Sequence, residues 1–298
     1  MTTVTPTSPV MSIDHSGTRA GYQWCRKLAR THYENFPVAS FMLPQKLRDP
    51  VAVIYAFARC ADDIADEGDL NDQQRLEKLD EMAAAVHRIE THQPPETPLY
   101  LALADTVQRH HLPLQPFYDL LSAFRQDVTQ TRYANFGELM DYCRRSANPV
   151  GRLLLHLSGN AGERNQALSD AICSALQLIN FLQDIGQDYA ENRRIYLPVD
   201  DMVRFNVSES QIAAGETSPG LRALVRHQAQ RAAQLLRAGS PLGTRLTGRF
   251  GLELRAIVLG GSRVLDKIHR QENSYSRPRL NRADRLAIVW QALRQGFH

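Results

Sequence analysis

Apolar residues in this 298-residue chain recur every three to four positions along almost its whole length. Strict alternation of apolar and polar residues, which is typical of a half-buried strand, is almost absent. The three-to-four spacing gathers apolar side chains on one face of an α-helix, so it limits the chain to an all-α fold. Helices are expected over residues 17–34, 45–67, 71–91, 98–110, 114–129, 135–147, 149–161, 165–190, 208–214, 217–238, 247–272 and 281–296.

The domain organisation follows from the breaks between these segments. The length suggests one large domain or two ordinary ones, because a domain has roughly 150 residues. The segment 91–98 is the most linker-like, but it comes too early to separate two cores of comparable size. We therefore expect a mobile Thr/Ser/Pro-rich tail over residues 1–15 and one all-α domain over residues 16–298.

Composition excludes several classes of protein. The 35 basic and 32 acidic residues nearly cancel, and no Lys/Arg-rich block is present, so no nucleic-acid partner is expected. Four separate cysteines fit no zinc framework. Neither a secretory signal nor an apolar run of about 20 residues occurs. These features predict a cytoplasmic protein whose membrane contact, if it has any, is peripheral, at the inner face of the cytoplasmic membrane.

A first acidic stripe lies within the expected helix 45–67. At about 100° per residue, Arg59, Asp62 and Asp66 share one face, with Tyr55 one turn earlier. Like charges four residues apart destabilise a helix by about 0.2–0.5 kcal/mol. The flanking residues are apolar, and apolar packing does not require this clustering of carboxylates, whereas a hard cation does.

A second stripe lies within the expected helix 165–190. Gln177, Asn180, Asp184 and Asp188 fall on one narrow face of that helix, and its other faces are apolar. Two such helices facing each other can build a metal site from inward carboxylates. Mg²⁺ usually takes one or two carboxylates together with substrate phosphates. The pair of stripes thus predicts a diphosphate held through Mg²⁺ above an apolar cavity; the plainer alternative is two solvated acidic faces.

At these residues the sequence resembles the squalene/phytoene synthase family of head-to-head prenyl synthases. The resemblance rests on Tyr55-Ala-Phe-Ala-Arg59-x-x-Asp62-Asp63-Ile-Ala-Asp66 and on Gln177-x-x-Asn180-x-x-x-Asp184-Ile-Gly-x-Asp188, which is followed by Arg194-Ile-Tyr-Leu-Pro198. It implies a single-domain isoprenoid-synthase helical bundle around a central cavity, with Mg²⁺ and an isoprenoid diphosphate substrate. The metal ligands that it implies are Asp62, Asp63, Asp66, Asn180, Asp184 and Asp188. The substrate contacts that it implies are Arg59, Phe36, Tyr55, Gln177, Asn180 and Arg194.

Two departures from the family pattern point to one branch of it. The segments Glu34-Asn-Phe-Pro-Val-Ala-Ser40 and Ser146-Ala-Asn-Pro-Val-Gly151 look like the bacterial hydroxysqualene synthase branch of hopanoid biosynthesis. That resemblance implies a lyase that converts presqualene diphosphate and water to hydroxysqualene and diphosphate. Its functional partners would be a presqualene diphosphate synthase and a hydroxysqualene reductase. The alternative is a head-to-head synthase that condenses two farnesyl diphosphates to presqualene diphosphate, squalene or dehydrosqualene, or forms phytoene from geranylgeranyl diphosphate.

Adding water to a carbocation requires polar groups beside a dry cavity. Tyr33, Glu34, Arg145 or Asn148 could position such a water, and we count Tyr33, Arg145 and Asn148 with the four aspartates as catalytic candidates. A helix N-cap at Asn148 with Pro149 in the first turn is an equally good interpretation of that residue.

Several other patterns were weighed. No GxGxxG fingerprint is present, so no nicotinamide cofactor is expected. Arg193-Arg194 could bind diphosphate or complement the end of a helix, and the basic segment 275–279 could meet diphosphate, anionic lipid or only solvent. Two further alternatives stay open: head-to-tail chain elongation, and a non-catalytic helical scaffold.

Overall fold

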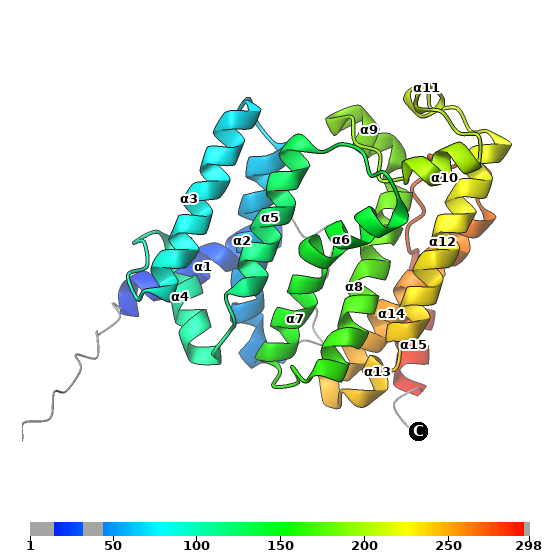
Figure 1. Cartoon of the computed structure of the whole chain (residues 1–298). Helices are drawn as coiled ribbons and strands as arrows, with labels where there is room; N and C mark the ends of the chain where they lie inside the picture. Colours follow the sequence, from blue (N-terminus) through cyan, green and yellow to red (C-terminus); the bar gives the residue numbers. More distant parts are fainter. Residues whose placement is uncertain (1–14, 32–43, 295–298) are drawn as a thin grey trace, which may run out of the picture.

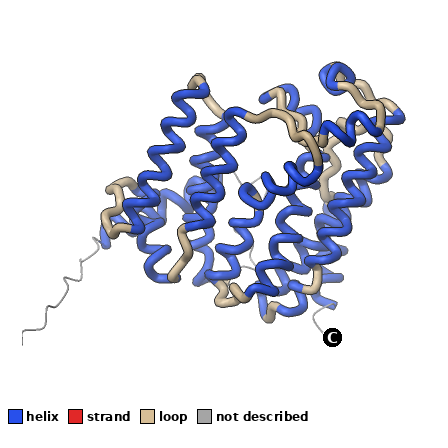
Figure 2. The backbone as a smooth tube through the Cα atoms, in the orientation of Figure 1, coloured by secondary structure: helices blue, strands red, loops and turns tan. Residues whose placement is uncertain are grey.

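The protein forms a layered bundle of helices in the computed structural model, which describes residues 15–31 and 44–294 (Figures 1 and 2). Within these ranges no strand forms, and only an isolated bridge joins Arg132 to Ile195. The all-α prediction is confirmed. The helices are α1 (His15–Thr31), α2 (Gln45–Asp66), α3 (Asp72–Glu90), α4 (Pro98–His110), α5 (Gln115–Thr129), α6 (Phe136–Ser146), α7 (Asn148–Leu157), α8 (Glu163–Gln183), α9 (Ile185–Asn192), α10 (Val199–Arg204), α11 (Glu209–Ala213), α12 (Pro219–Gly239), α13 (Leu242–Arg245), α14 (Gly248–Arg270) and α15 (Arg282–Arg294).

Two expectations about the helices were wrong. The single helix expected over 165–190 is two helices, α8 and α9, which are separated at Asp184. The short helices α10 and α13, of six and four residues, were missed. The mobile tail expected over residues 1–15 lies almost entirely outside the described residues, and the single domain over 16–298 stays a prediction.

Side-chain capping sets where several helices begin. Asn71 accepts a hydrogen bond from the Gln74 amide while the Gln74 side chain accepts one from the Asn71 amide, which forms a capping box before α3. Ser218 caps α12 in the same position, ahead of a proline in the first turn. These local signals were visible in the sequence, so the starts of these helices lie close to the expected positions.

The apolar side chains form two buried clusters. One is built on α8, α12 and α14 and the segments around them, and the other on α1, α2, α3, α4 and α5. Phe250 of α14 packs against both clusters. The C-terminal ends of α2 and α8 lie near the same end of the bundle (Figure 1), so the two acidic stripes approach each other there.

None of the helices in the described part of the chain combines the length and apolar character needed to cross a membrane.

Candidate active site

The acidic end of α2 is organised around Arg59. Its guanidinium pairs with Asp62 at 3.1 Å and with Asp63 at 2.5 Å, and it also pairs with Glu67. Arg59, Asp62 and Asp63 are half-buried on the last turns of α2, where Tyr55, also half-buried, lies one turn before Arg59. Burial and the neighbouring Asp66 raise the pKa of Asp62 to about 6. The first stripe is therefore a carboxylate cluster that is paired with an arginine and only partly exposed to solvent.

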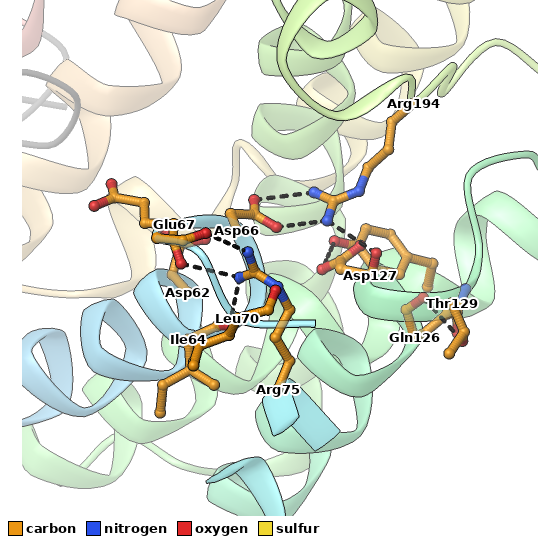
Figure 3. A network of polar contacts seen from close by, with 12 residues as sticks. Asp62, Ile64, Asp66, Glu67, Leu70, Arg75, Gln126, Asp127, Thr129 and Arg194 are labelled. Carbon is orange, nitrogen blue, oxygen red and sulfur yellow. Dashed lines mark hydrogen bonds and ion pairs between the residues drawn. The ribbon is translucent and has the colours of Figure 1, made fainter. Parts of the chain in front are cut away.

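Arg194 contacts both stripes: its backbone amide donates to the Asp188 carbonyl at 3.1 Å, and its side chain meets Asp66 (Figure 3). It is buried, and its two terminal nitrogens donate to the carboxylate oxygens of Asp66 at 3.0 and 2.5 Å. The same guanidinium donates to the backbone carbonyl of Asp127 at 2.9 Å. The two-point geometry is the strong form of an arginine–carboxylate pair. A residue that follows α9 thus binds the first stripe across 128 positions of sequence.

The second stripe is bent at Asp184. This residue ends α8 and precedes α9, with φ −111° and ψ 14°, so its backbone is not helical. The Arg277 guanidinium pairs with its carboxylate, with Nε 2.6 Å from one oxygen and a terminal nitrogen 3.0 Å from the other. Burial and the adjacent Asp184 raise the pKa of Asp188 to about 8. The break does not separate the stripe, because the Asp188 amide still donates to the Asp184 carbonyl at 2.8 Å.

A buried polar and aromatic cluster lies beside Arg194. The Tyr142 hydroxyl donates to the carboxylate of buried Asp127 at 2.8 Å, and burial raises the pKa of Asp127 to about 7. Tyr196 stacks on Phe181 with ring centroids 3.7 Å apart, and both rings are near Tyr142. The negative faces of aromatic rings can stabilise a positive charge nearby. The acidic residues are therefore backed by an aromatic surface.

The other residues that were predicted to contact substrate or to take part in catalysis differ in exposure and in their contacts. Gln177 is half-buried on α8 and Asn180 is exposed near its end. Arg145 pairs with Asp141 and donates to Ser122 at 3.0 Å and also to Gln126, which ties α6 to α5. Tyr33, Glu34 and Phe36 lie outside the described residues.

The expected N-cap role of Asn148 is wrong. The N-cap of α7 is Ala147, and it makes no side-chain capping bond. Asn148 is the first residue of α7, and its side chain is buried and accepts a hydrogen bond from Ser174 of α8 at 2.9 Å. Pro149 does lie in the first turn, so the Asn-Pro pair breaks the chain between α6 and α7 as its sequence suggests.

Sequence reasoning missed Asp127 and Arg75. A signal for Asp127 was present: it shares the buried face of α5 with Leu120 and Ala123, at spacings of seven and four. Arg75 donates to the carbonyl oxygens of four residues at the end of α2 and in the turn after it, at 2.7 to 3.1 Å (Figure 3). An arginine in an exposed-looking helix gives no such signal, because its partners are backbone atoms.

The donor chemistry of the site fits Mg²⁺ shared with a diphosphate. In residues 15–31 and 44–294, no three Asp, Glu, His or Cys side chains converge as a complete metal-ligand set. Mg²⁺ does not require one, because it keeps several waters and takes one or two carboxylates plus phosphate oxygens. The four aspartates offer oxygen donors at the end of α2 and at the junction of α8 and α9, and Arg194 and Arg277 offer planar donors that match phosphate.

Comparison with known proteins agrees with this geometry. The family model described as squalene/phytoene synthase matches residues 29–285. The chain is 38% identical over 245 residues to a hydroxysqualene synthase of Rhodopseudomonas palustris, covering 82% of each chain. It is 34% identical to a hydroxysqualene synthase of Zymomonas mobilis, covering 87% of this chain and 86% of that one.

A solved structure agrees as well. The crystal structure of a squalene synthase from Alicyclobacillus acidocaldarius superposes with a TM-score of 0.80 at 36% identity, covering 88% of this chain and 97% of that one. The family match spans most of the chain, and the fold and the two acidic stripes agree with it. This chain belongs to the squalene/phytoene synthase family and is an enzyme of isoprenoid biosynthesis.

Proposed function

We propose that this chain converts presqualene diphosphate and water to hydroxysqualene and diphosphate in a Mg²⁺-dependent reaction. The observation that carries the proposal is the 38% identity, over 82% of both chains, to a protein named hydroxysqualene synthase. The geometry of the site supports it, because carboxylates for a metal–diphosphate complex lie beside buried aromatic rings.

The residues divide between the two ends of the substrate. Asp62, Asp66, Asp184 and Asp188 would hold Mg²⁺, with Asn180 assisting, and the bound ion would neutralise charge on the leaving diphosphate. Arg59, Arg194 and Arg277 each pair with an aspartate of the stripes. Each arginine would exchange part of that pairing for phosphate oxygens when the substrate enters, because guanidinium matches phosphate in the same two-point geometry.

The chemical step breaks one bond and forms another. The C–O bond to diphosphate breaks with its electron pair on the leaving group, and the positive charge stays on the hydrocarbon. The aromatic cluster of Tyr142, Tyr196 and Phe181 lies beside the acidic residues and would stabilise a positive charge that develops near it. Water then adds to the carbon and loses a proton, which gives the alcohol. No reductant is consumed, so no nicotinamide is required.

Product analysis tests the proposal directly. Purified protein incubated with presqualene diphosphate and Mg²⁺, without nicotinamide, should release diphosphate and hydroxysqualene. Squalene formed only after a reductant is added would contradict the water-addition step. A C30 product from farnesyl diphosphate alone would instead favour a head-to-head condensing synthase.

Substitution of one aspartate tests the assigned site. Asp188→Asn removes one carboxylate and keeps the shape of the side chain. We expect kcat to fall by about 10²-fold or more, because electrostatic stabilisation of a leaving group is usually a large term. Glu191→Gln, which removes an exposed carboxylate close by on α9, is the matched control and should retain activity. Normal turnover in Asp188→Asn would show that the reaction does not need this carboxylate and would contradict the assigned site.

The reaction also places the enzyme between two others. Its substrate is a preformed C30 diphosphate, so a presqualene diphosphate synthase must supply it. Its product is an alcohol, and reaching the hydrocarbon requires a hydroxysqualene reductase. We further propose that the enzyme works at the cytoplasmic membrane surface, because substrate and product are long apolar molecules.

A further inference from the structure

The C-terminal helix α15 exposes a row of large apolar side chains. Leu286 is 74% exposed, Val289 48%, Trp290 58% and Leu293 44%. These positions are spaced at three and four residues, so at about 100° per residue they occupy one stripe of the helix. They make up four of the seven large apolar side chains that are exposed in the described part of the chain. We refer to these four residues as the α15 stripe.

The opposite face of α15 is fixed to the bundle. Ile288 and Ala292 are buried, and the helix packs on α14, as Figure 1 shows at the C-terminal side of the molecule. Lys267 of α14 binds Asp284 at 2.5 Å, and Arg255 of α14 donates to the Ala292 carbonyl at 2.9 Å. The helix is therefore apolar on two sides while only one side is covered. A helix with apolar residues around most of its surface is usually buried on most of its surface.

The charges around the α15 stripe are positive. Arg282, Arg285 and Arg294 are all exposed on this helix. The only acidic residue of α15 is Asp284, and Lys267 neutralises it. Arg294 also lies over the ring of Trp290, with its guanidinium carbon 4.4 Å from the ring centroid. Apolar residues with a tryptophan, bordered by arginines, are typical of a helix that lies in a membrane interface.

We propose that the α15 stripe docks this protein on the surface of a bilayer that contains anionic lipid. The four apolar side chains would enter the boundary between headgroups and acyl chains, and the three arginines would contact lipid phosphates. A second copy of the chain is a poorer occupant. A two-fold symmetric contact would bring the three exposed arginines of one copy against those of the other, with no free acid on either helix to pair them.

Vesicle flotation with the full chain tests the proposal. The vesicles would contain phosphatidylcholine with either no phosphatidylglycerol or about 30% of it, and free and bound protein would be separated on a density gradient. We expect binding to the anionic vesicles and about tenfold weaker binding for Leu286→Gln/Trp290→Gln, because two large side chains would lose their burial in lipid. Binding should also weaken with rising salt, since the arginine contribution is screened.

A matched substitution tests whether vesicle binding depends on the α15 stripe or on any exposed apolar side chain. Val203→Gln, 74% exposed on α10, removes an equally exposed apolar side chain elsewhere and should leave vesicle binding unchanged. Turnover measured in detergent should be unaffected in all three proteins, so a failure of the proposed reaction is distinguishable from a failure of docking. Equal binding by wild type and the double variant would overturn the proposal. So would a dimer in sedimentation velocity that the double variant dissociates.

Discussion

At the scale of single residues, the least expected feature is Asp127, a buried carboxyl whose pKa burial raises to about 7. An unfolded chain ionises this group near pH 4, so between about pH 4 and 7 the native state holds a proton that the unfolded state has released. Stability from this group is therefore present at low pH and is lost as pH rises through that window.

Asp127→Asn measures that loss. The amide keeps an acceptor for the Tyr142 hydroxyl but cannot ionise. We expect the free energy of unfolding of the variant, relative to wild type, to rise between pH 5 and 7 by at most about 1.4 kcal/mol per pH unit. Above pH 7 the difference should level off. Urea titrations at several pH values provide the measurement, and a difference independent of pH would show that Asp127 does not titrate in this range.

At the scale of elements, the packing of α12 on α8 depends on Gly239. A Cβ atom at this position would lie 2.5 Å from Cγ1 of Ile172 and 2.6 Å from the Leu168 carbonyl oxygen, both on α8. Because α8 carries the second acidic stripe, this contact also positions the site.

Gly239→Ala should therefore destabilise the protein by about 1–3 kcal/mol, since helix backbones must separate to admit the methyl group. Gly260→Ala is the control, because it lies inside α14 and its Cβ position meets only Cδ1 of Leu280, at 3.5 Å, which is an ordinary van der Waals contact. It should be neutral or stabilising by up to about 1 kcal/mol, since Ala favours a helix interior more than Gly does. The urea midpoints of the two variants provide the measurement. Equal midpoints would contradict the prediction, because they would mean that α8 and α12 can move apart at no cost.

The helices also show how much of the fold and of the site could be predicted from the sequence. Periodicity was enough for the long helices and for both acidic stripes, because apolar spacing reports burial directly. It failed at Asp184, where α8 ends although the helical pattern of polar residues continues through Asp188. The partners of the stripes were equally hidden. Arg277 lies 93 positions after Asp184, and no local pattern reports which distant guanidinium a carboxylate meets.

At the scale of the whole molecule, the two apolar clusters raise the question of whether they unfold together. The chain has two tryptophans: Trp24 lies on α1, a helix of the cluster built on α1 to α5, and Trp290 lies on α15, which packs on α14 of the other cluster. Phe250 contacts both clusters, and the Arg194–Asp66 pair connects them at the other end.

We expect a single cooperative transition. In Trp290→Phe the fluorescence reports on Trp24 alone, and in Trp24→Phe it reports on Trp290 alone. Both variants should unfold in urea with the same midpoint once each is referenced to its own circular dichroism curve, because coincident probes are the mark of two-state unfolding. Two separated midpoints would show two domains and contradict the single-domain prediction.

The contacts of Arg75 have a consequence for how this sequence can change over time. Its guanidinium holds the turn after Asp66 only through main-chain carbonyls, which every residue possesses. Substitutions at Asp69 or Leu70 therefore leave the anchoring atoms in place, while Gly68, at φ 77°, keeps its need for a left-handed backbone. Single substitutions of these side chains should therefore be tolerated during evolution. The acidic end of α2 keeps its position as long as Arg75 is retained.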